Sequence, residues 1–314
     1  MSANVLFDAP GPRARRNQRI AGVITVLVLA GILGFIAYRF AQTGQFESKM
    51  WSPFTNPNVI RALTNGLINT ILAAVFAIIF ALIFGAVFGA MRLSSVAPLR
   101  WIGTIVVEFF RAVPLVLLIL FVFLGFRQEL QAASDTIGLT NLMDNAGLGR
   151  SQGALFALVI GLTLYNGSVL AEIFRAGVNS VPKGQREAAY AIGLTQGQTL
   201  WMILAPQAVR TMLPAIVSQS VVALKDTSLG FIVAFGEIVR TGQLIAADPA
   251  RRNYIQMAIV IGAVFIIINY ALSKLAQYLS ARQRKVKKLT PIKADPLLPP
   301  DTAIEIETER QLKD

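Results

Sequence analysis

The sequence contains no cysteine and no histidine among its 314 residues. The lack of cysteine excludes disulfides, thiolate nucleophiles and cysteine-based zinc sites. The lack of histidine removes the commonest metal ligand and the commonest general base, and with them every Ser-His or Cys-His catalytic arrangement. A chain without either residue is a poor candidate for an enzyme or a metalloprotein. We therefore predict no catalytic residue and no metal site.

Charged residues are also scarce, at 15% of the chain, whereas hydrophobic residues make up 54% and the mean hydropathy is +0.59. Because an ordinary soluble domain has about 25% charged residues, this composition indicates a membrane protein. The formal net charge is +12, but the sequence lacks the basic stripe with interleaved aromatics that is typical of nucleic-acid binding. The positive residues gather instead at the ends of apolar runs. We therefore expect membrane lipids, and not nucleic acid, as partners of this charge.

Six windows of the sequence are long and apolar enough to cross a bilayer as helices, which takes about 20 residues each. They cover residues 20–38, 67–91, 101–126, 153–171, 211–236 and 254–273. The first follows a basic segment, as in a signal peptide, but its apolar run is too long for that and no good cleavage site follows. The predicted fold class is therefore an all-α integral membrane protein with six transmembrane helices.

The basic residues predict the orientation of these helices. With the N-terminus inside, the cytoplasmic segments carry 19 of the 29 Lys and Arg residues, and the outer segments carry 8. Both termini are therefore predicted to be cytoplasmic. Residues 1–19 form a basic N-terminal segment, and residues 281–314 form a tail that is rich enough in proline and polar residues to be largely disordered.

One predicted cytoplasmic segment, 182–206, differs in character from the rest of the chain. Pro182 can begin a helix, Glu187 lies near the N-terminal end where a carboxylate is favoured, and Gly193 interrupts the run. A second helix with an apolar side begins near Thr199. Two interpretations stay open at this point: an amphipathic loop that lies on the bilayer, or a rigid knob that inserts into a groove of another protein.

The same segment resembles the signature loop of permease subunits of bacterial ABC importers, which reads Glu-Ala-Ala, three residues, Gly, nine residues, Ile, two residues, Pro. Ala205 stands where leucine is usual. Three further motifs, FFRAVPL (109–115), LTLYNGSVLAEIFRAGV (162–178) and LKDTSL (224–229), are similar to the polar amino-acid uptake branch, and most similar to the permeases of glutamate systems. The residues that match the signature loop are Glu187, Ala188, Ala189, Gly193, Ile203 and Pro206.

The resemblance covers residues 60–280 and implies a type I importer permease domain of five core helices, preceded by an extra transmembrane helix at 20–38. It implies a multi-pass protein in the plasma membrane of a bacterium. It also implies three partners: an ABC ATPase dimer docked on 182–206, a second permease that is identical or homologous, and an extracytoplasmic substrate-binding protein. The chain has no G-x-x-x-x-G-K-[ST] P-loop. We therefore expect no cofactor here, with ATP bound by the partner ATPase.

Polar and charged residues inside the predicted spans are rare and usually functional. Glu108 and Arg111 are spaced to pair on one helix face, whereas the neighbours Lys225 and Asp226 each need a separate partner. Such charges can match the ammonium and carboxylate groups of an amino acid. Asn166 is a further candidate for the substrate pathway. The alternative is that these residues only hold the helices of the bundle together.

Two backbone features complete the prediction from sequence. Gly85 and Gly89 form a GxxxG pair in the second span, which predicts close packing against another helix. Pro114 lies in the third span and is expected to break the helix and free backbone carbonyls of a kind that often line cavities.

The sequence therefore predicts a transport subunit, not an enzyme, that carries a polar amino acid, glutamate above all, with energy from ATP hydrolysis on a separate subunit. An ion-coupled secondary transporter that works without an ATPase is the first alternative, although we find no internal repeat of the kind such transporters usually contain. An intramembrane enzyme is the second. It would have only Glu108 and Asp226 for catalysis, and nothing in the sequence places these two residues together.

Overall fold

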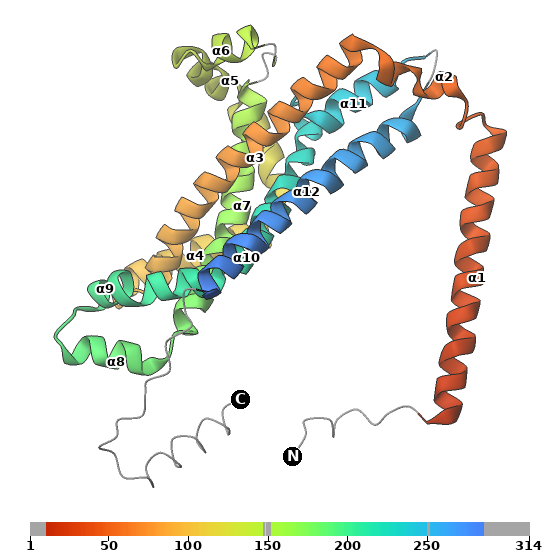
Figure 1. Ribbon diagram of the computed structural model, residues 1–314. Helices are drawn as coiled ribbons and strands as arrows, with labels where there is room; N and C mark the ends of the chain where they lie inside the picture. The colour runs from red at the N-terminus through yellow and green to blue at the C-terminus, as the bar shows by residue number, and fades with distance from the viewer. Residues whose placement is uncertain (1–10, 147, 149–151, 250–251, 286–314) are drawn as a thin grey trace.

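The computed structural model describes residues 11–146, 148, 152–249 and 252–285, and these residues form helices without any strand (Figure 1). The predicted all-α fold class is thereby confirmed. Residues 1–10 of the predicted basic segment and 286–314 of the predicted tail lie outside the described residues. The α-helices are α1 (Pro12–Gln42), α2 (Ser48–Trp51), α3 (Pro57–Arg92), α4 (Ala97–Ala112), α5 (Leu115–Thr136), α6 (Leu139–Asn145), α7 (Gln152–Asn179), α8 (Lys183–Ala191), α9 (Gln196–Gln198), α10 (Ala205–Asp226), α11 (Ile238–Ala246) and α12 (Tyr254–Lys285). The remaining turns are 3-10 helices η1 (Ser52–Thr55) and η3 (Thr227–Val233) and the π-helix η2 (Thr199–Leu204).

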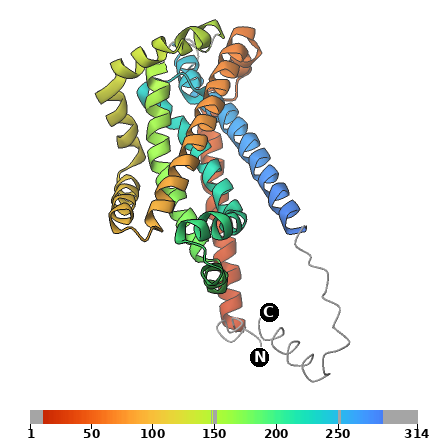
Figure 2. The same ribbon diagram turned by 90° about the vertical axis from the view of Figure 1, so that its left-hand side faces the viewer.

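Six helical stretches of the described chain are long and apolar enough to cross a membrane, as the sequence predicted. The small helices α8 and α9 lie at one end of the bundle, and α2 and α6 lie at the other (Figures 1 and 2). The N-terminal end of α1 and the far end of α12 point toward the end that carries α8 (Figure 1). The six stretches are Pro12–Gln42, Pro57–Arg92, Leu115–Thr136, Gln152–Asn179, Gln196–Val233 and Tyr254–Lys274.

The third predicted span is wrong in its bounds. Residues 101–126 do not form one helix, because α4 ends at Ala112 and α5 begins only after Pro114. A proline disfavours helical backbone at the residue before it, and Val113 is accordingly extended, with ψ of 128°. The break predicted at Pro114 is confirmed, and its consequence is that α4 is a separate helix and the apolar span runs over Leu115–Thr136.

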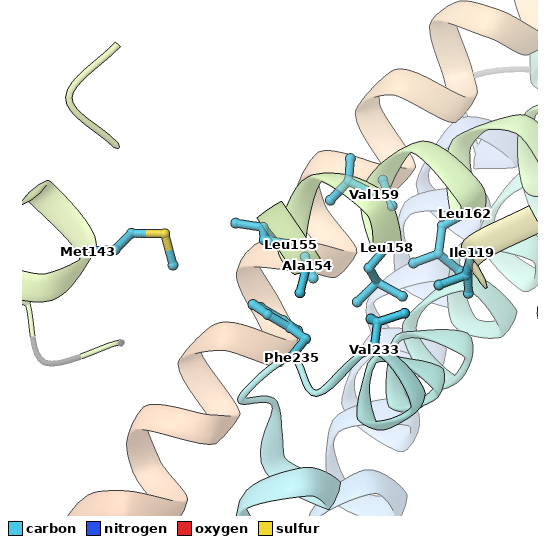
Figure 3. Packing of buried hydrophobic residues seen from close by; sticks show 11 residues of the cluster. Ile119, Met143, Ala154, Leu155, Leu158, Val159, Leu162, Val233 and Phe235 are labelled. Atoms are coloured by element: carbon cyan, nitrogen blue, oxygen red, sulfur yellow. The ribbon is translucent and has the colours of Figure 1, made fainter. Parts of the chain in front are cut away.

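The helix α7 lies at the centre of the bundle, where it packs against α3, α5 and α10. One hydrophobic cluster joins Leu158 of α7 to Ile119 of α5 and to Phe235 after η3 (Figure 3). A helix that is surrounded by others has to be apolar on nearly every side. This explains why the only charged residues of α7, Glu172 and Arg175, lie near its C-terminal end.

Glycines allow α3 to approach α7 closely. A Cβ atom added at Gly85 would lie 2.7 Å from Leu170 Cβ and 3.1 Å from the backbone nitrogen of Ala171. One added at Gly89 would lie 3.0 Å from the backbone oxygen of Ala171. Side chains have no room at either position. The close packing predicted from the GxxxG pair is therefore confirmed, and the structure identifies α7 as its partner.

The first helix, α1, stands apart from the bundle, and none of its residues is buried (Figure 1). The chain that follows it is nevertheless attached to the start of α12. There the Gln256 side-chain amide donates to the Gln45 backbone oxygen at 2.5 Å, and that of Asn253 donates to the Met50 oxygen at 3.3 Å. This arrangement agrees with an extra span at 20–38 that is added to a separate bundle of helices.

A buried acid caps the helix α11 at the end of the bundle opposite α8. The Glu237 carboxyl group accepts hydrogen bonds from the backbone N–H groups of Val239 and Arg240, at 2.7 Å and 2.6 Å. The side chain is fully buried. Burial raises the pKa of Glu237 to about 7 and outweighs the two hydrogen bonds, which lower it.

This buried acid makes the stability of the protein depend on pH. The pKa of Glu237 is about 7 in the folded chain against an ordinary value of 4.5. Between these two pH values the folded chain keeps a proton on Glu237 that the unfolded chain has lost. Its contribution is fully present below about pH 4.5 and falls by about 3 kcal/mol as the pH rises to about 7. A Glu237→Gln variant should lack this decline. Thermal unfolding midpoints of both proteins between about pH 4 and pH 8 check the prediction, and parallel curves would contradict it.

Candidate functional site

The segment 182–206, called the docking loop from here on, forms a helix, a tight turn and a π-helical turn that continues into α10. The helix α8 begins directly after Pro182, as expected. Glu187 lies in the middle of α8 and not in its first turn, so the expected stabilisation of its carboxylate by the helix N-terminus is wrong. Pro206 lies in the first turn of α10, inside the apolar stretch Gln196–Val233, and does not interrupt the helix there.

The tight turn of the docking loop is closed by Gly193. Its φ of +84° is a left-handed conformation that favours glycine. The Gly193 N–H donates to the Tyr190 oxygen at 2.9 Å, and the Leu194 N–H donates to the Ala189 oxygen at 3.1 Å. This pair of bonds is the Schellman motif that ends many helices. The helix interruption predicted at Gly193 is confirmed.

The second half of the loop begins with a capping box and continues as a π-helix. The Gln198 N–H donates to the Thr195 hydroxyl at 3.4 Å, and the Thr195 N–H donates to the Gln198 side chain at 2.9 Å. We attribute the π-helix that follows to Pro206, because a proline ring clashes with the carbonyl four residues earlier, here that of Met202, and donates no N–H to it. Widened turns of this kind are frequent at functional sites.

The inner side of the docking loop is packed onto the bundle. The Gln196 side-chain amide donates to the Leu93 backbone oxygen, in the turn between α3 and α4, at 2.9 Å. The rings of Trp201 and Phe174 lie 6.2 Å apart. The loop is therefore in direct contact with α7 and with the turn between α3 and α4. The buried cluster behind it consists of Phe174, Val178, Val181, Leu204, Ala205, Ala208 and Met212.

The outer side of the docking loop carries most of the signature residues. Glu187, Ala188, Gly193 and Pro206 are exposed. Ala189 is buried, and α8 packs there against the π-helical turn. The sixth signature residue, Ile203, is partly buried against the cluster behind the loop. The structure thus divides the signature into residues that face outward and residues that fix the loop to the bundle.

Large apolar side chains are exposed on the same loop, and the signature does not include them. Ile192 at the turn is 76% exposed, and Met202 is 63% exposed. Tyr190 and Trp201 are also exposed. Their signal in the sequence is the presence of aromatic and aliphatic residues in an otherwise polar segment. Exposed apolar side chains on a stiff helical support are suited to insertion into a groove.

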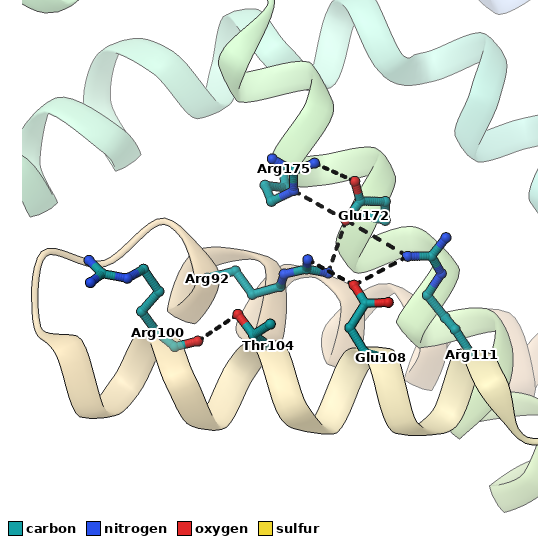
Figure 4. Close-up of polar contacts among 7 residues, drawn as sticks. All are labelled: Arg92, Arg100, Thr104, Glu108, Arg111, Glu172 and Arg175. Atoms are coloured by element: carbon teal, nitrogen blue, oxygen red, sulfur yellow. Dashed lines mark hydrogen bonds and ion pairs between the residues drawn. The ribbon is translucent and has the colours of Figure 1, made fainter.

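The five residues predicted for the substrate pathway fall into two separate groups. Glu108 and Arg111 lie near the C-terminal end of α4, in a cluster of charges shown in Figure 4. Asn166 lies in the middle of α7, and Lys225 and Asp226 end α10. No interaction of the described residues joins the two groups. The assignment of these residues to a pathway therefore stays a prediction.

The charge cluster joins three helices (Figure 4). The expected pair is confirmed, with Arg111 Nη1 lying 3.5 Å from Glu108 Oε1. Arg92, at the end of α3, lies 3.0 Å from Glu108 and 2.9 Å from Glu172 of α7. Arg175 donates two hydrogen bonds to Glu172. Arg92 was missed from sequence because it stands at the edge of a span and its partners come from distant segments.

The second group is organised around the buried amide of Asn166, which is 1% exposed. The Gln219 amide of α10 donates to Asn166 Oδ1 at 2.6 Å, and Asn166 Nδ2 donates to the Leu162 oxygen at 3.1 Å. Asp226, at the end of α10, lies near this amide. Lys225 is exposed, and the ion pairs found among the described residues do not include it. The separate partners expected for Lys225 and Asp226 therefore stay a prediction.

The apolar helices and the loop at one end of the bundle together define a multi-pass membrane protein. The model of the family of binding-protein-dependent transport system inner membrane components matches residues 81–285. The chain belongs to this family, whose members are transport permeases of bacterial plasma membranes. The resemblance stated from the sequence motifs is confirmed.

Two permeases with glutamate in their names are similar in sequence to this chain. The glutamate transport system permease protein GluD of Corynebacterium glutamicum is 39% identical over 263 residues, which cover 83% of this chain and 90% of that protein. The glutamate/aspartate import permease protein GltK of Escherichia coli is 32% identical over 195 residues, or 61% of this chain and 80% of that protein.

Solved structures share the fold. An amino acid ABC transporter crystallised with histidines has a TM-score of 0.57 at 25% identity, and the match covers 71% of this chain and 94% of that one. The MetNI methionine ABC transporter has a TM-score of 0.50 at 17% identity, covering 70% and 94%, which supports the fold alone. The described helices are thus arranged as in permeases of ABC importers.

Proposed function

We propose that this chain forms half of the pore of an ABC importer that carries a polar amino acid, glutamate above all, into the cytoplasm. Separate ATPase subunits bind and hydrolyse ATP, and they dock on the loop 182–206. A second permease, identical or homologous, completes the pore. A substrate-binding protein delivers the amino acid to the outer segments. ATP binding and hydrolysis then switch the pore between outward and inward access.

The build of the docking loop is the observation that carries this proposal. Its turn is closed by a Schellman motif at Gly193, and its inner side is fixed to the bundle by the Gln196 bond and a buried cluster. A loop that only rested on lipid would need no such internal fixing. A stiff loop with Ile192 and Met202 exposed is instead suited to transmit force from a protein groove.

The choice of glutamate rests on the relatives and on the charges of the chain. Both GluD and GltK carry glutamate in their names, and GluD matches most of this chain. The cations Arg111 and Lys225 lie in or beside the spans, where a carboxylate of the substrate would need a partner. An acidic amino acid has two carboxylates, one on the α-carbon and one on the side chain, and could use both cations.

Reconstitution tests the proposal. The permease should be purified together with its ATPase and its second permease and placed in vesicles with the binding protein. We expect uptake of labelled glutamate that needs ATP and exceeds uptake of glutamine and arginine. Uptake of glutamate by vesicles that contain the permease without the ATPase would contradict the proposal and would favour an ion-coupled secondary transporter.

Lys225 offers a test of substrate binding. If its ammonium group pairs with a substrate carboxylate, a Lys225→Gln variant should raise the half-saturating glutamate concentration about tenfold or more, because charge-assisted hydrogen bonds contribute about 1.5–3 kcal/mol. Uptake measured over a range of glutamate concentrations checks this. The control is Lys274→Gln, since Lys274 is an exposed cation on α12. An unchanged half-saturating concentration with less protein in the membrane would assign Lys225 a structural role.

A further inference from the structure

We infer that Arg92 is the coupling residue of this permease, because it clamps the ends of α3, α4 and α7 into one body that moves with the docking loop. The inference rests on the proposed function, since it assumes that an ATPase moves that loop. Arg92 contacts no substrate in this role. It positions the helices that carry the predicted pathway residues.

The guanidinium group of Arg92 joins carboxylates from two different helices (Figure 4). Nη2 donates a hydrogen bond to Glu108 of α4 at 3.0 Å. Nη1 lies 2.9 Å from Glu172 of α7, in an ion pair whose angle does not make a hydrogen bond. The Arg92 side chain is only 10% exposed. A planar fork that is shielded from solvent holds two carboxylates at a fixed separation, which a flexible ammonium group cannot do.

The docking loop contacts the same end of α3 through a hydrogen bond and apolar packing. Gln196 donates to the backbone oxygen of Leu93, the residue directly after Arg92, at 2.9 Å. Leu93 and Ala90 also pack against the cluster that contains Leu204 and Ala205. A displacement of the loop therefore acts on the last turn of α3, and Arg92 passes it to α4 and α7.

The two helices that Arg92 joins lead to both groups of predicted pathway residues. The helix α4 carries Glu108 and Arg111 and ends at the break before Pro114. The helix α7 carries Asn166. The C-terminal end of α3 is also in close contact with the N-terminal half of α4, since a Cβ atom added at Gly103 would lie 3.2 Å from the Arg92 backbone nitrogen. Arg92 extends this contact to the C-terminal half of α4.

The charge balance of the cluster allows Arg92 to be removed without leaving a carboxylate unpaired. Glu108 keeps Arg111, whose Nη1 lies at 3.5 Å, and Glu172 keeps Arg175, which makes two hydrogen bonds to it. Two cations then face two carboxylates. An Arg92→Gln variant should therefore assemble, and its defect should lie in the connection between the helices.

The test compares transport with hydrolysis in the reconstituted complex. At saturating substrate, Arg92→Gln should lower the number of amino acids moved per ATP hydrolysed by at least about fivefold, as expected for a lost contact within one network. Hydrolysis itself and the half-saturating substrate concentration should stay near the wild-type values. Arg92→Lys should give an intermediate ratio, because one ammonium group cannot span both carboxylates.

The matched control is Arg100→Gln, because Arg100 lies on α4 and its side chain, among the described residues, donates only to the Ser94 backbone oxygen, at 3.4 Å. This variant should keep the wild-type ratio. A wild-type ratio in Arg92→Gln would overturn the inference. If Arg92→Gln fails to assemble, a wild-type ratio in Arg92→Lys would overturn it instead. A wild-type complex without ATP-driven uptake would count against the proposed function and not against Arg92.

Discussion

A Gly193→Pro variant is expected to stay in the membrane and to lose at least about nine-tenths of its ATP-driven uptake. Proline fixes φ near about −65°, whereas Gly193 has φ of +84°. Proline also lacks the N–H that donates to the Tyr190 oxygen. A local cost of about 3 kcal/mol or more reduces the population of the native loop about 100-fold or more. The buried contacts of the bundle lie elsewhere, so the chain should still fold.

The measurement is uptake together with ATP hydrolysis in the same vesicles. Hydrolysis should continue while uptake is lost, because the ATPase subunits still hydrolyse ATP but no longer change the conformation of the permease. Gly184→Ala is the matched control, since Gly184 lies inside α8 with nothing within 4 Å of an added Cβ atom. It should transport normally and can stabilise the helix by about 0.5–1 kcal/mol. Normal uptake in Gly193→Pro would remove the basis for the docking role.

The features that the sequence predicted well depend on neighbouring residues. Long apolar runs gave the number of spans and located all but the third, because crossing a bilayer requires a helix of known length. The turn at Gly193 was predictable because glycine ends helices in a left-handed conformation. The pair Glu108 and Arg111 was predictable because residues three apart share a helix face.

The features that the sequence predicted poorly depend on contacts between distant segments. Glu108 was paired with Arg111 from sequence, but its shorter contact is with Arg92, 16 residues away. Asn166 is fixed by Gln219, 53 residues away. Such partners cannot be read from spacing within one helix. The predicted span over 101–126 was wrong for another reason. Its bounds were set from the apolar composition alone, although the break at Pro114 divides this stretch into α4 and α5.

The position of Glu187 shows how a small error in a helix boundary changes a physical argument. The favourable effect of a helix N-terminus on a carboxylate falls off within the first turn. Because α8 begins at Lys183, Glu187 lies beyond that turn. Its carboxylate is exposed and free of this effect. An ATPase docked on this loop would therefore reach Glu187 because the side chain is exposed, and not through the helix dipole.

A Gly85→Leu variant is expected to lose a large part of the stability of the folded protein. The added Cβ atom would lie 2.7 Å from Leu170 Cβ and 3.1 Å from the Ala171 backbone nitrogen, so relief requires the backbones of α3 and α7 to separate. Overpacking typically costs about 1–3 kcal/mol, and contacts with backbone place this case at or above the upper end. Against a total stability of about 5–15 kcal/mol, that loss is large.

The matched control for Gly85→Leu is Gly31→Leu in α1, where nothing lies within 4 Å of an added Cβ atom. Both substitutions add the same apolar side chain to an apolar span, so transfer into the bilayer is favourable in each and only the packing differs. The amount of folded protein after detergent extraction and the thermal unfolding midpoint should fall sharply for Gly85→Leu and stay unchanged for Gly31→Leu. Equal behaviour of the two variants would mean that the helices α3 and α7 do not meet at Gly85. The central position of α7, on which the connection from the docking loop to the spans depends, would then be wrong as well.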